Sequence, residues 1–480
     1  MSTAPVTAAP WSERLQERVG PIVVKEVRQG LRAKVFAIFF SVLLTACLLA
    51  ALVAVAEVSD RTGDSSLGKG FLAAYLVGLA GVTCFVIPFT AFRSMLREQE
   101  EETWVLLLLT GLGGRHIVRG KWVSAMSQAM LFASAAAPFV VFTYYLNGID
   151  IPQIVTALAL LTVWSCLLTA LGIAIATQAR SRLGRTFAHF VALATLGGGT
   201  FAACAFGVLL SEEGSRLLQE DGFITLCGGL FAFALLATWL VLEGAAAGLA
   251  LASEAASAGP RRAMAVLTAV GLAFGGAAFL FHKTPTDGPA AGSVLTSLFL
   301  VLCGAFAVSE RDGFPARLSG AGWRKPGALR SYWLLLALLA LCTTVWVVLY
   351  GSSSGGDGSG KRLRTLLAAP LYPALYLSAA AFFGRVTGLR RLGEPLATRV
   401  AFVGLVVLGT VVPPVFSLVA AGRGNDRSIN ALNPLVGMAN FIDRSGRELD
   451  GALLVLAVVT LLFVFLATNV LWSRDGARTA

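Results

Sequence analysis

The stretch VFAIFFSVLLTACLLAALVAVA, residues 35–56, runs for 22 positions without a charged side chain. A helix that crosses the hydrocarbon core of a bilayer needs about 20 apolar residues. Backbone amides in hydrocarbon have no water to bind, so a helix, which satisfies them internally, is the conformation expected there. The stretch therefore predicts a transmembrane helix.

Similar apolar runs recur along the whole chain. Of its 480 residues 56% are apolar and only 14% are charged, whereas soluble domains carry about a quarter charged residues. We therefore predict an all-α, polytopic transmembrane helical bundle. Its twelve spans are expected at residues 35–56, 71–92, 122–146, 154–177, 187–210, 222–243, 263–281, 289–309, 331–350, 364–384, 398–421 and 450–472.

The basic residues predict the orientation of these spans. Most of the 38 Lys and Arg residues fall in segments that share one side with the N-terminus, so the positive-inside rule places both termini in the cytoplasm. The expected location is the cell (inner) membrane. This topology also accounts for the net charge of +11, which in a soluble chain would suggest nucleic acid as a partner.

The expected organisation has five parts. They are a cytoplasmic N-terminus with an interfacial helix (1–34), a first transmembrane half (35–310) with a long cytoplasmic loop (93–121), a cytoplasmic linker (311–330), a second transmembrane part (331–473) and a short cytoplasmic tail (474–480).

The sequence offers no chemistry of its own for catalysis. The seven cysteines fall inside predicted spans without a CxxC pair, and there are only three histidines, so we expect no metal site and no structural disulfide. The string GDSSLGKG at residues 63–70 ends in Gly70 where a phosphate-binding loop needs Ser or Thr, and no strand precedes it. We predict a protein that is not an enzyme and binds no cofactor itself.

Charged residues are nearly absent from the middle of the spans. An ion-coupled carrier normally has titratable groups at that depth. Glu243 and His189 lie near span ends, where we expect them at the membrane interface. Pro88 removes a hydrogen bond from the second span and permits a kink.

The segment before the first span, GPIVVKEVRQGLRAKVF, has the pattern of an amphipathic helix. Val23, Val24, Val27 and Leu31 fall on one face, and basic residues occupy the remainder. Such a helix should begin at Pro21 and lie on the anionic cytoplasmic leaflet.

The loop 93–121 contains TWVLLLLTGL, which is too short to span a bilayer and too apolar for a solvated loop. The acidic residues before it are expected in a helix's first turn, where the dipole favours them. Glycines at 111, 113 and 114 should then end that helix, and RHIVRGK should start a second one. Two short helices at the inner face suit the docking of a soluble partner; a charged loop resting in the headgroups is the alternative.

At this point the sequence resembles a known family. GPIVVKEVRQGLR, then two spans, then EEETWVLLLLTGLGGRHIVRGKW look like the permease subunits of type-2 ABC exporters, and the likeness is clear over about residues 15–190. The resemblance implies a coupling helix that inserts into a separate ATP-binding subunit. It assigns to the ATPase-coupling loop Glu100, Glu101, Glu102, Thr103, Trp104, Leu107, Leu108, Thr110, Arg115 and Lys121, and to an interfacial elbow helix Pro21, Lys25, Glu26, Arg28 and Arg32.

The function implied is that of an ABC-transporter permease that forms the translocation pathway, with export as the direction. ATP would bind to the partner ATPase, and a second permease copy or paralogue and the lipid bilayer would be further partners; nucleic acid would not. The later loop RVTGLRRLGEPLATR (385–399) lacks the glutamate run, so we do not expect two equivalent permeases in one chain. The alternatives are a twelve-span secondary carrier, or a non-transporting membrane scaffold or lipid-active enzyme.

Overall fold

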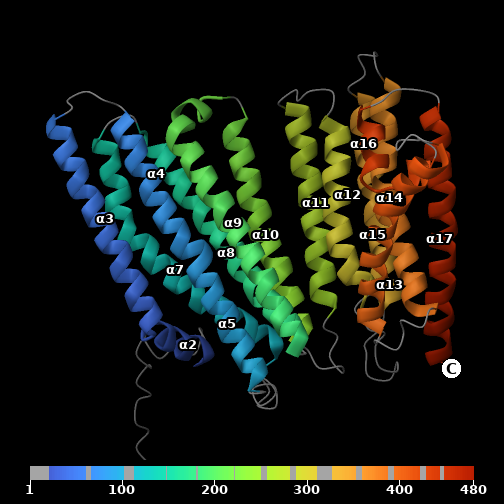
Figure 1. Ribbon diagram of the computed structural model, residues 1–480, viewed down its shortest axis with the longest axis horizontal. Helices are drawn as coiled ribbons and strands as arrows, with labels where there is room; N and C mark the ends of the chain where they lie inside the picture. Colours follow the sequence, from blue (N-terminus) through green and yellow to red (C-terminus); the bar gives the residue numbers. More distant parts are fainter. Residues whose placement is uncertain are drawn as a thin grey trace, which may run out of the picture. The chain divides into compact units, whose positions relative to one another are not determined.

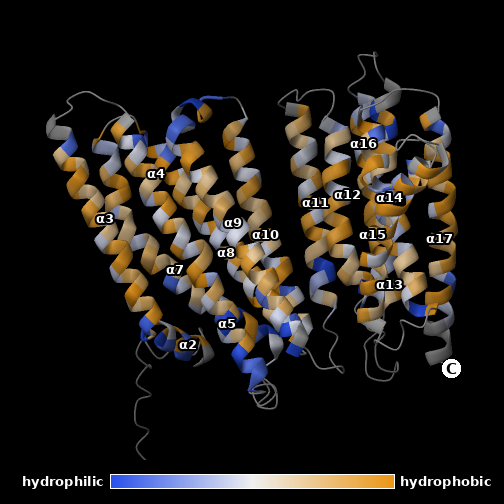
Figure 2. Cartoon of the chain, viewed as in Figure 1, coloured by the Kyte–Doolittle hydropathy of each residue, from blue (hydrophilic) through white to orange (hydrophobic). Residues whose placement is uncertain are grey.

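A computed structural model of the chain describes residues 21–60, 66–101, 113–146, 149–179, 182–220, 222–249, 257–281, 288–310, 327–352, 359–386, 394–421, 429–443 and 448–479 (Figure 1). Across these ranges the regular structure is helical and no strand occurs. Twelve of the helical segments are long and apolar enough to cross a membrane. Hydrophobic residues run along them, and hydrophilic ones gather at α2 and at the end of α5 (Figure 2). The chain is therefore a multi-pass, all-helical membrane protein, as predicted.

The chain forms two compact units, residues 1–250 and 251–480. This division differs from the predicted one at 310/311. The prediction placed a cytoplasmic linker at 311–330, whereas the helices from residue 258 to 308 pack with those that follow them. Six of the membrane-length segments described lie in each unit.

Unit 1 is built around its fourth span. The elements are α2 (Pro21–Leu31), α3 (Lys34–Asp60), α4 (Ser66–Ala80), the π-helix η1 (Gly81–Val86), α5 (Ile87–Glu100), α7 (Gly114–Tyr145), α8 (Ile151–Gln178), α9 (Arg182–Leu217) and α10 (Phe223–Leu249). The segments α4, η1 and α5 form one continuous second span. The helix α8 packs against α5, α7, α9 and α10. Close approach is possible because Gly172 has no side chain: a Cβ there would lie 2.9 Å from the carbonyl oxygen of Pro88.

The second span continues beyond its apolar stretch. It was predicted to end at residue 92, but α5 runs to Glu100, with Glu101 as its C-cap. Phe92, Met95 and Leu96 are all buried and keep one helical face packed, so the helix extends where the hydropathy falls. Glu100 therefore lies in the last turn of α5, and its predicted place in the first turn of a following helix is wrong.

The helix after the loop is also longer than expected. The N-cap of α7 is Gly113, in an extended conformation, and the helix runs without a break from Gly114 to Tyr145. Gly113 thus marks the start of α7, whereas the helix that the glycines were predicted to end lies outside the described residues. The basic segment RHIVRGK is not a separate short helix but the first two turns of the third span, because the apolar residues that follow continue the same helix.

Unit 2 has α14 at its centre. The elements are α11 (Ala258–Phe281), α12 (Gly288–Val308), α13 (Ala328–Ser352), α14 (Ser359–Val386), α15 (Glu394–Ala421), the 3-10 helix η4 (Ile429–Leu432), α16 (Val436–Asp443) and α17 (Glu448–Thr479). The helix α14 packs against α12, α13, α15 and α17 and is the most buried of the spans described. Tyr372 and Tyr376 of α14 donate hydrogen bonds of 2.8 Å to the carbonyl oxygens of Ala431 and Leu432, respectively. These two hydrogen bonds hold η4 against α14.

Candidate functional site

The structure describes part of the predicted site. Four residues of the predicted coupling loop lie within the described ranges: Glu100, Glu101, Arg115 and Lys121. So do all five residues of the predicted elbow helix. The remaining predicted residues lie outside the described residues; they are Glu102, Thr103, Trp104, Leu107, Leu108 and Thr110.

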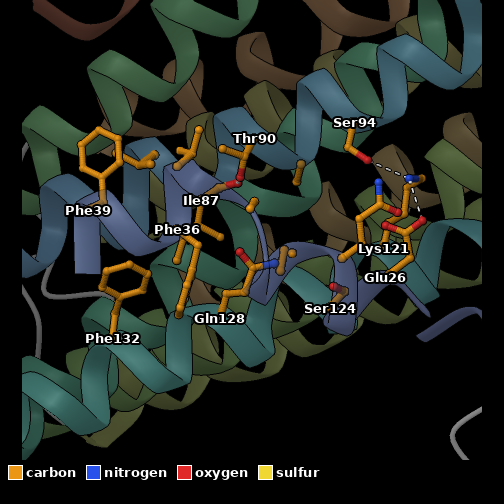
Figure 3. A pocket seen from close by; sticks show the side chains of 17 residues that line it. Glu26, Phe36, Phe39, Ile87, Thr90, Ser94, Lys121, Ser124, Gln128 and Phe132 are labelled. Atoms are coloured by element: carbon orange, nitrogen blue, oxygen red, sulfur yellow. Dashed lines mark hydrogen bonds and ion pairs between the residues drawn. The ribbon is translucent and has the colours of Figure 1, made fainter. Parts of the chain in front are cut away.

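The buried ammonium of Lys121 joins three elements of unit 1 (Figure 3). Its side chain is 4% exposed, and its Nζ lies 2.8 Å from Glu98 Oε1 on α5 and 3.3 Å from Glu26 Oε1 on α2. Nζ also donates a 2.8 Å hydrogen bond to Ser94 Oγ on α5. The three N–H groups of the ammonium thus have three acceptors. We call Lys121, Glu98, Glu26 and Ser94 the Lys121 cluster; it ties the start of α7 to the end of α5 and to α2.

A second cluster ties α7 to α10. Glu243 is 6% exposed at its side chain, and its two oxygens lie 3.0 Å from Arg115 Nη2 and 2.9 Å from Arg119 Nη2. The arginines stand four residues apart, so they share one face of α7. Both arginines are about half exposed. Glu243 was expected at an exposed interface; it lies near the end of α10 as predicted but is buried and paired.

A third contact reaches α9. Glu100 Oε1 lies 3.4 Å from Arg185 Nη1, and both side chains are partly exposed, so this pair contributes little to stability. Next to it, His189 Nδ1 donates a 2.8 Å hydrogen bond to the carbonyl oxygen of Arg185, and the imidazole ring meets the Phe92 ring edge-on. The contact joins the end of α5 to the start of α9.

The helix α2 lies crosswise at the foot of α3 (Figure 1) and packs against α7. Val23, Val24 and Val27 are half-buried, whereas Leu31 is exposed. Glu26 turns inward to the Lys121 cluster. The basic residues predicted for the elbow helix are exposed; they are Lys25, Arg28 and Arg32.

A cavity of about 200 Å³ adjoins the Lys121 cluster (Figure 3). Its walls come from α2, the start of α3, the second span and α7, with Ser124 and Gln128 on the polar side and Phe36 and Phe132 on the apolar side. Gly30 of α2 lies beside it, and a Cβ there would lie 2.3 Å from Gln128 Nε2, so the end of that side chain would have to move.

Sequence reasoning missed four residues of these contacts, although a signal was present. Ser94 and Glu98 stand four positions apart on α5, as Arg115 and Arg119 do on α7, which predicts one shared helical face each. What the sequence could not supply is which partners these faces meet.

Comparisons with protein families, curated proteins and solved structures find no match. Within the described ranges, no group of three or more His, Cys, Asp or Glu could hold a metal ion. Ion pairs connect the end of α5 to α9, and the start of α7 to α2 and α10.

Proposed function

We propose that the chain is the membrane-spanning permease of an ATP-driven exporter of the ABC type, which couples to a separate ATPase subunit through the loop 93–121. The observation that carries this proposal is the Lys121 cluster. A buried ammonium that two carboxylates from different elements surround holds the loop's flanks to α2 as one body. A partner that moves the loop would therefore also move α2 and the adjoining ends of α5 and α7.

The ion pairs give the routes along which such a movement would pass. Displacement of the α5 end acts on α9 through Glu100 and Arg185. Displacement of the α7 start acts on α10 through the arginines that bind Glu243, and on α2 through Glu26. ATP binding and hydrolysis belong to the partner, and this chain's residues convert the push into rearranged helices.

The exposed cations of α2 support an interfacial position for this helix. Lys25, Arg28 and Arg32 can bind anionic headgroups of the cytoplasmic leaflet while Glu26 stays in the Lys121 cluster. The membrane surface would then hold α2 in place while the coupling loop moves the helices that are joined to α2.

Co-purification tests this proposal. The tagged protein is solubilised from native membranes in mild detergent, and the partners of wild type are compared with those of the Glu101→Lys/Glu102→Lys variant. This pair spares Glu100 and its contact with Arg185. The matched control is Glu212→Lys/Glu213→Lys, an exposed glutamate pair near the other end of α9; the hydrogen bond that Lys69 makes to Glu212 uses the backbone oxygen and is retained.

We expect an ATP-binding subunit to accompany wild type and the control, and to fall at least about tenfold in the loop variant. If no ATP-binding subunit accompanies wild type under several gentle conditions, the coupling proposal fails. Substrate transport by the chain alone in liposomes would then identify a secondary carrier, and its absence a scaffold.

A further inference from the structure

The two units share one pattern of helix packing. In unit 1 the first span, α3, packs against the second and third, and the second packs against the third, fourth and fifth. The third packs against the fourth and sixth, and the fourth packs against the fifth and sixth. Each of these helix pairs has its counterpart in unit 2, where the spans in order are α11, α12, α13, α14, α15 and α17.

The order along the chain makes this agreement informative. Six spans in each unit bring the chain back to the side on which it began, so corresponding helices run in the same direction. Parallel repeats of this kind are one of the ways in which transporter folds are built. A shared order, a shared direction and a shared central fourth helix are the features that a duplicated unit would have.

A polar cluster recurs at the corresponding place. In unit 2 the end of the second span carries Glu310, whose Oε2 lies 2.6 Å from Arg261 Nη2 near the start of the first span. Ser331, near the start of the third span, donates a hydrogen bond to the same oxygen and accepts one of 2.7 Å from Arg261 Nε. Arg261 is 3% exposed and Glu310 is 15% exposed. We call these three residues the Glu310 cluster.

The two clusters join the same places in the two units. Each has a glutamate at the end of the second span, Glu98 or Glu310, and a side chain at the start of the third, Lys121 or Ser331. Each also has a group at the foot of the first span, where unit 1 has α2 and unit 2 has the first turn of α11. The difference is the cation, which the third span supplies in unit 1 and the first span in unit 2.

We infer that the chain is a tandem pair of one six-helix unit, in which the Glu310 cluster takes the positioning role that the Lys121 cluster has in unit 1. Resting on the proposed function, this means that one chain supplies both six-helix units of the transporter and acts without a second permease. From the sequence we did not expect two equivalent permeases in one chain, because the loop 385–399 lacks the glutamate run of the loop 93–121. In the repeat, 385–399 follows a fourth span, and the connection that corresponds to the coupling loop is the one between α12 and α13.

Moving the cation tests the correspondence of the clusters. Arg261→Ala leaves Glu310 without its cation, and Ser331→Lys then offers one from the third span, as Lys121 does. We expect Arg261→Ala to lower the temperature of thermal inactivation in detergent by about 10 °C and the added Ser331→Lys to recover at least about half of that. The matched control is Arg262→Ala, which removes an exposed charge next along α11 and should shift the temperature little.

Failure of Ser331→Lys to recover any stability, or an equal effect of the two arginine variants, would overturn the correspondence. If Arg261→Ala does not accumulate, the membrane yield of the double variant relative to the single one gives the same answer.

The number of chains in each purified particle tests whether one chain acts without a second permease. Two differently tagged copies of the full chain are co-expressed, and particles captured through one tag are probed for the other. We expect the second tag to be recovered only at background level, and light scattering to give one 50.2 kDa chain per particle. Two copies in each particle would refute the inference whether or not an ATPase is bound. A single chain without any ATPase would refute only the proposed function.

Discussion

Replacing Lys121 by methionine tests the central cluster most directly. With an effective dielectric constant of about 20, a pair of unit charges 2.8 to 3.3 Å apart has about 5 to 6 kcal/mol of Coulomb attraction. Desolvation of the ammonium offsets part of this, and removal of one partner from a buried ion pair costs about 3 to 5 kcal/mol. Glu98 is 21% and Glu26 16% exposed, so water reaches both and the lower end applies. We expect a loss of about 3 kcal/mol.

For a unit of this size the loss corresponds to about 6 to 12 °C in the midpoint of thermal inactivation. Heated samples in detergent are separated by size-exclusion chromatography, and the fraction that stays monodisperse is followed. Lys69→Met, which removes an exposed lysine that binds a backbone oxygen, is the control. The triple variant Glu26→Gln/Glu98→Gln/Lys121→Met should recover most of the loss, because no uncompensated charge stays behind. A single variant no worse than the control, or a triple variant worse than the single, would refute this reasoning.

Two further predictions concern unit 1 and use the same heating assay. Glu243→Gln should lower the free energy of unfolding by at most about 1 kcal/mol, because the arginines it releases are half exposed and return to water. Arg115→Ala/Arg119→Ala should lower it by about 2 to 3 kcal/mol, because a buried carboxylate is left unpaired. Equal losses for the two variants would contradict this prediction. Gly172→Ala should cost about 1 to 3 kcal/mol because the new methyl meets a backbone oxygen, while Gly228→Ala, with no atom within 4 Å of its Cβ, should be neutral or stabilising; the order of the two midpoints decides.

The sequence predicted the fold class and the number of spans because both depend on local apolar content. Helix ends were predicted less well. Hydropathy falls after Phe92, and only the three-dimensional packing of Met95 and Leu96 explains why α5 continues to Glu100. The same reason applies at Gly114, where a basic segment belongs to the third span.

Several residues of the candidate site were predicted from the sequence, but their ion-pair partners were not. Lys121 and Glu26 were both singled out, yet each for a separate stretch of chain, and nothing in the sequence pairs residues 95 positions apart. Glu243 was placed near the correct end of its span, but its burial depends on arginines 124 and more positions away. The boundary between the two units, at residues 250 and 251, differs from the predicted one for the same reason, since packing partners decide it and composition does not.

The π-helix η1 has a consequence for the register of the second span. The N–H of Ile87 bonds to the carbonyl oxygen of Val82, five residues back, so this turn holds one residue more than an α-helical turn. One residue of an α-helix corresponds to a rotation of about 100°. The wide turn absorbs this extra residue, so deleting a single residue from Gly81–Val86 would restore an ordinary helix and leave the helix after it near its present orientation. Ser94 and Glu98 would still face Lys121, and the extra residue instead shifts the sequence spacing of the two halves of this span by one position relative to each other.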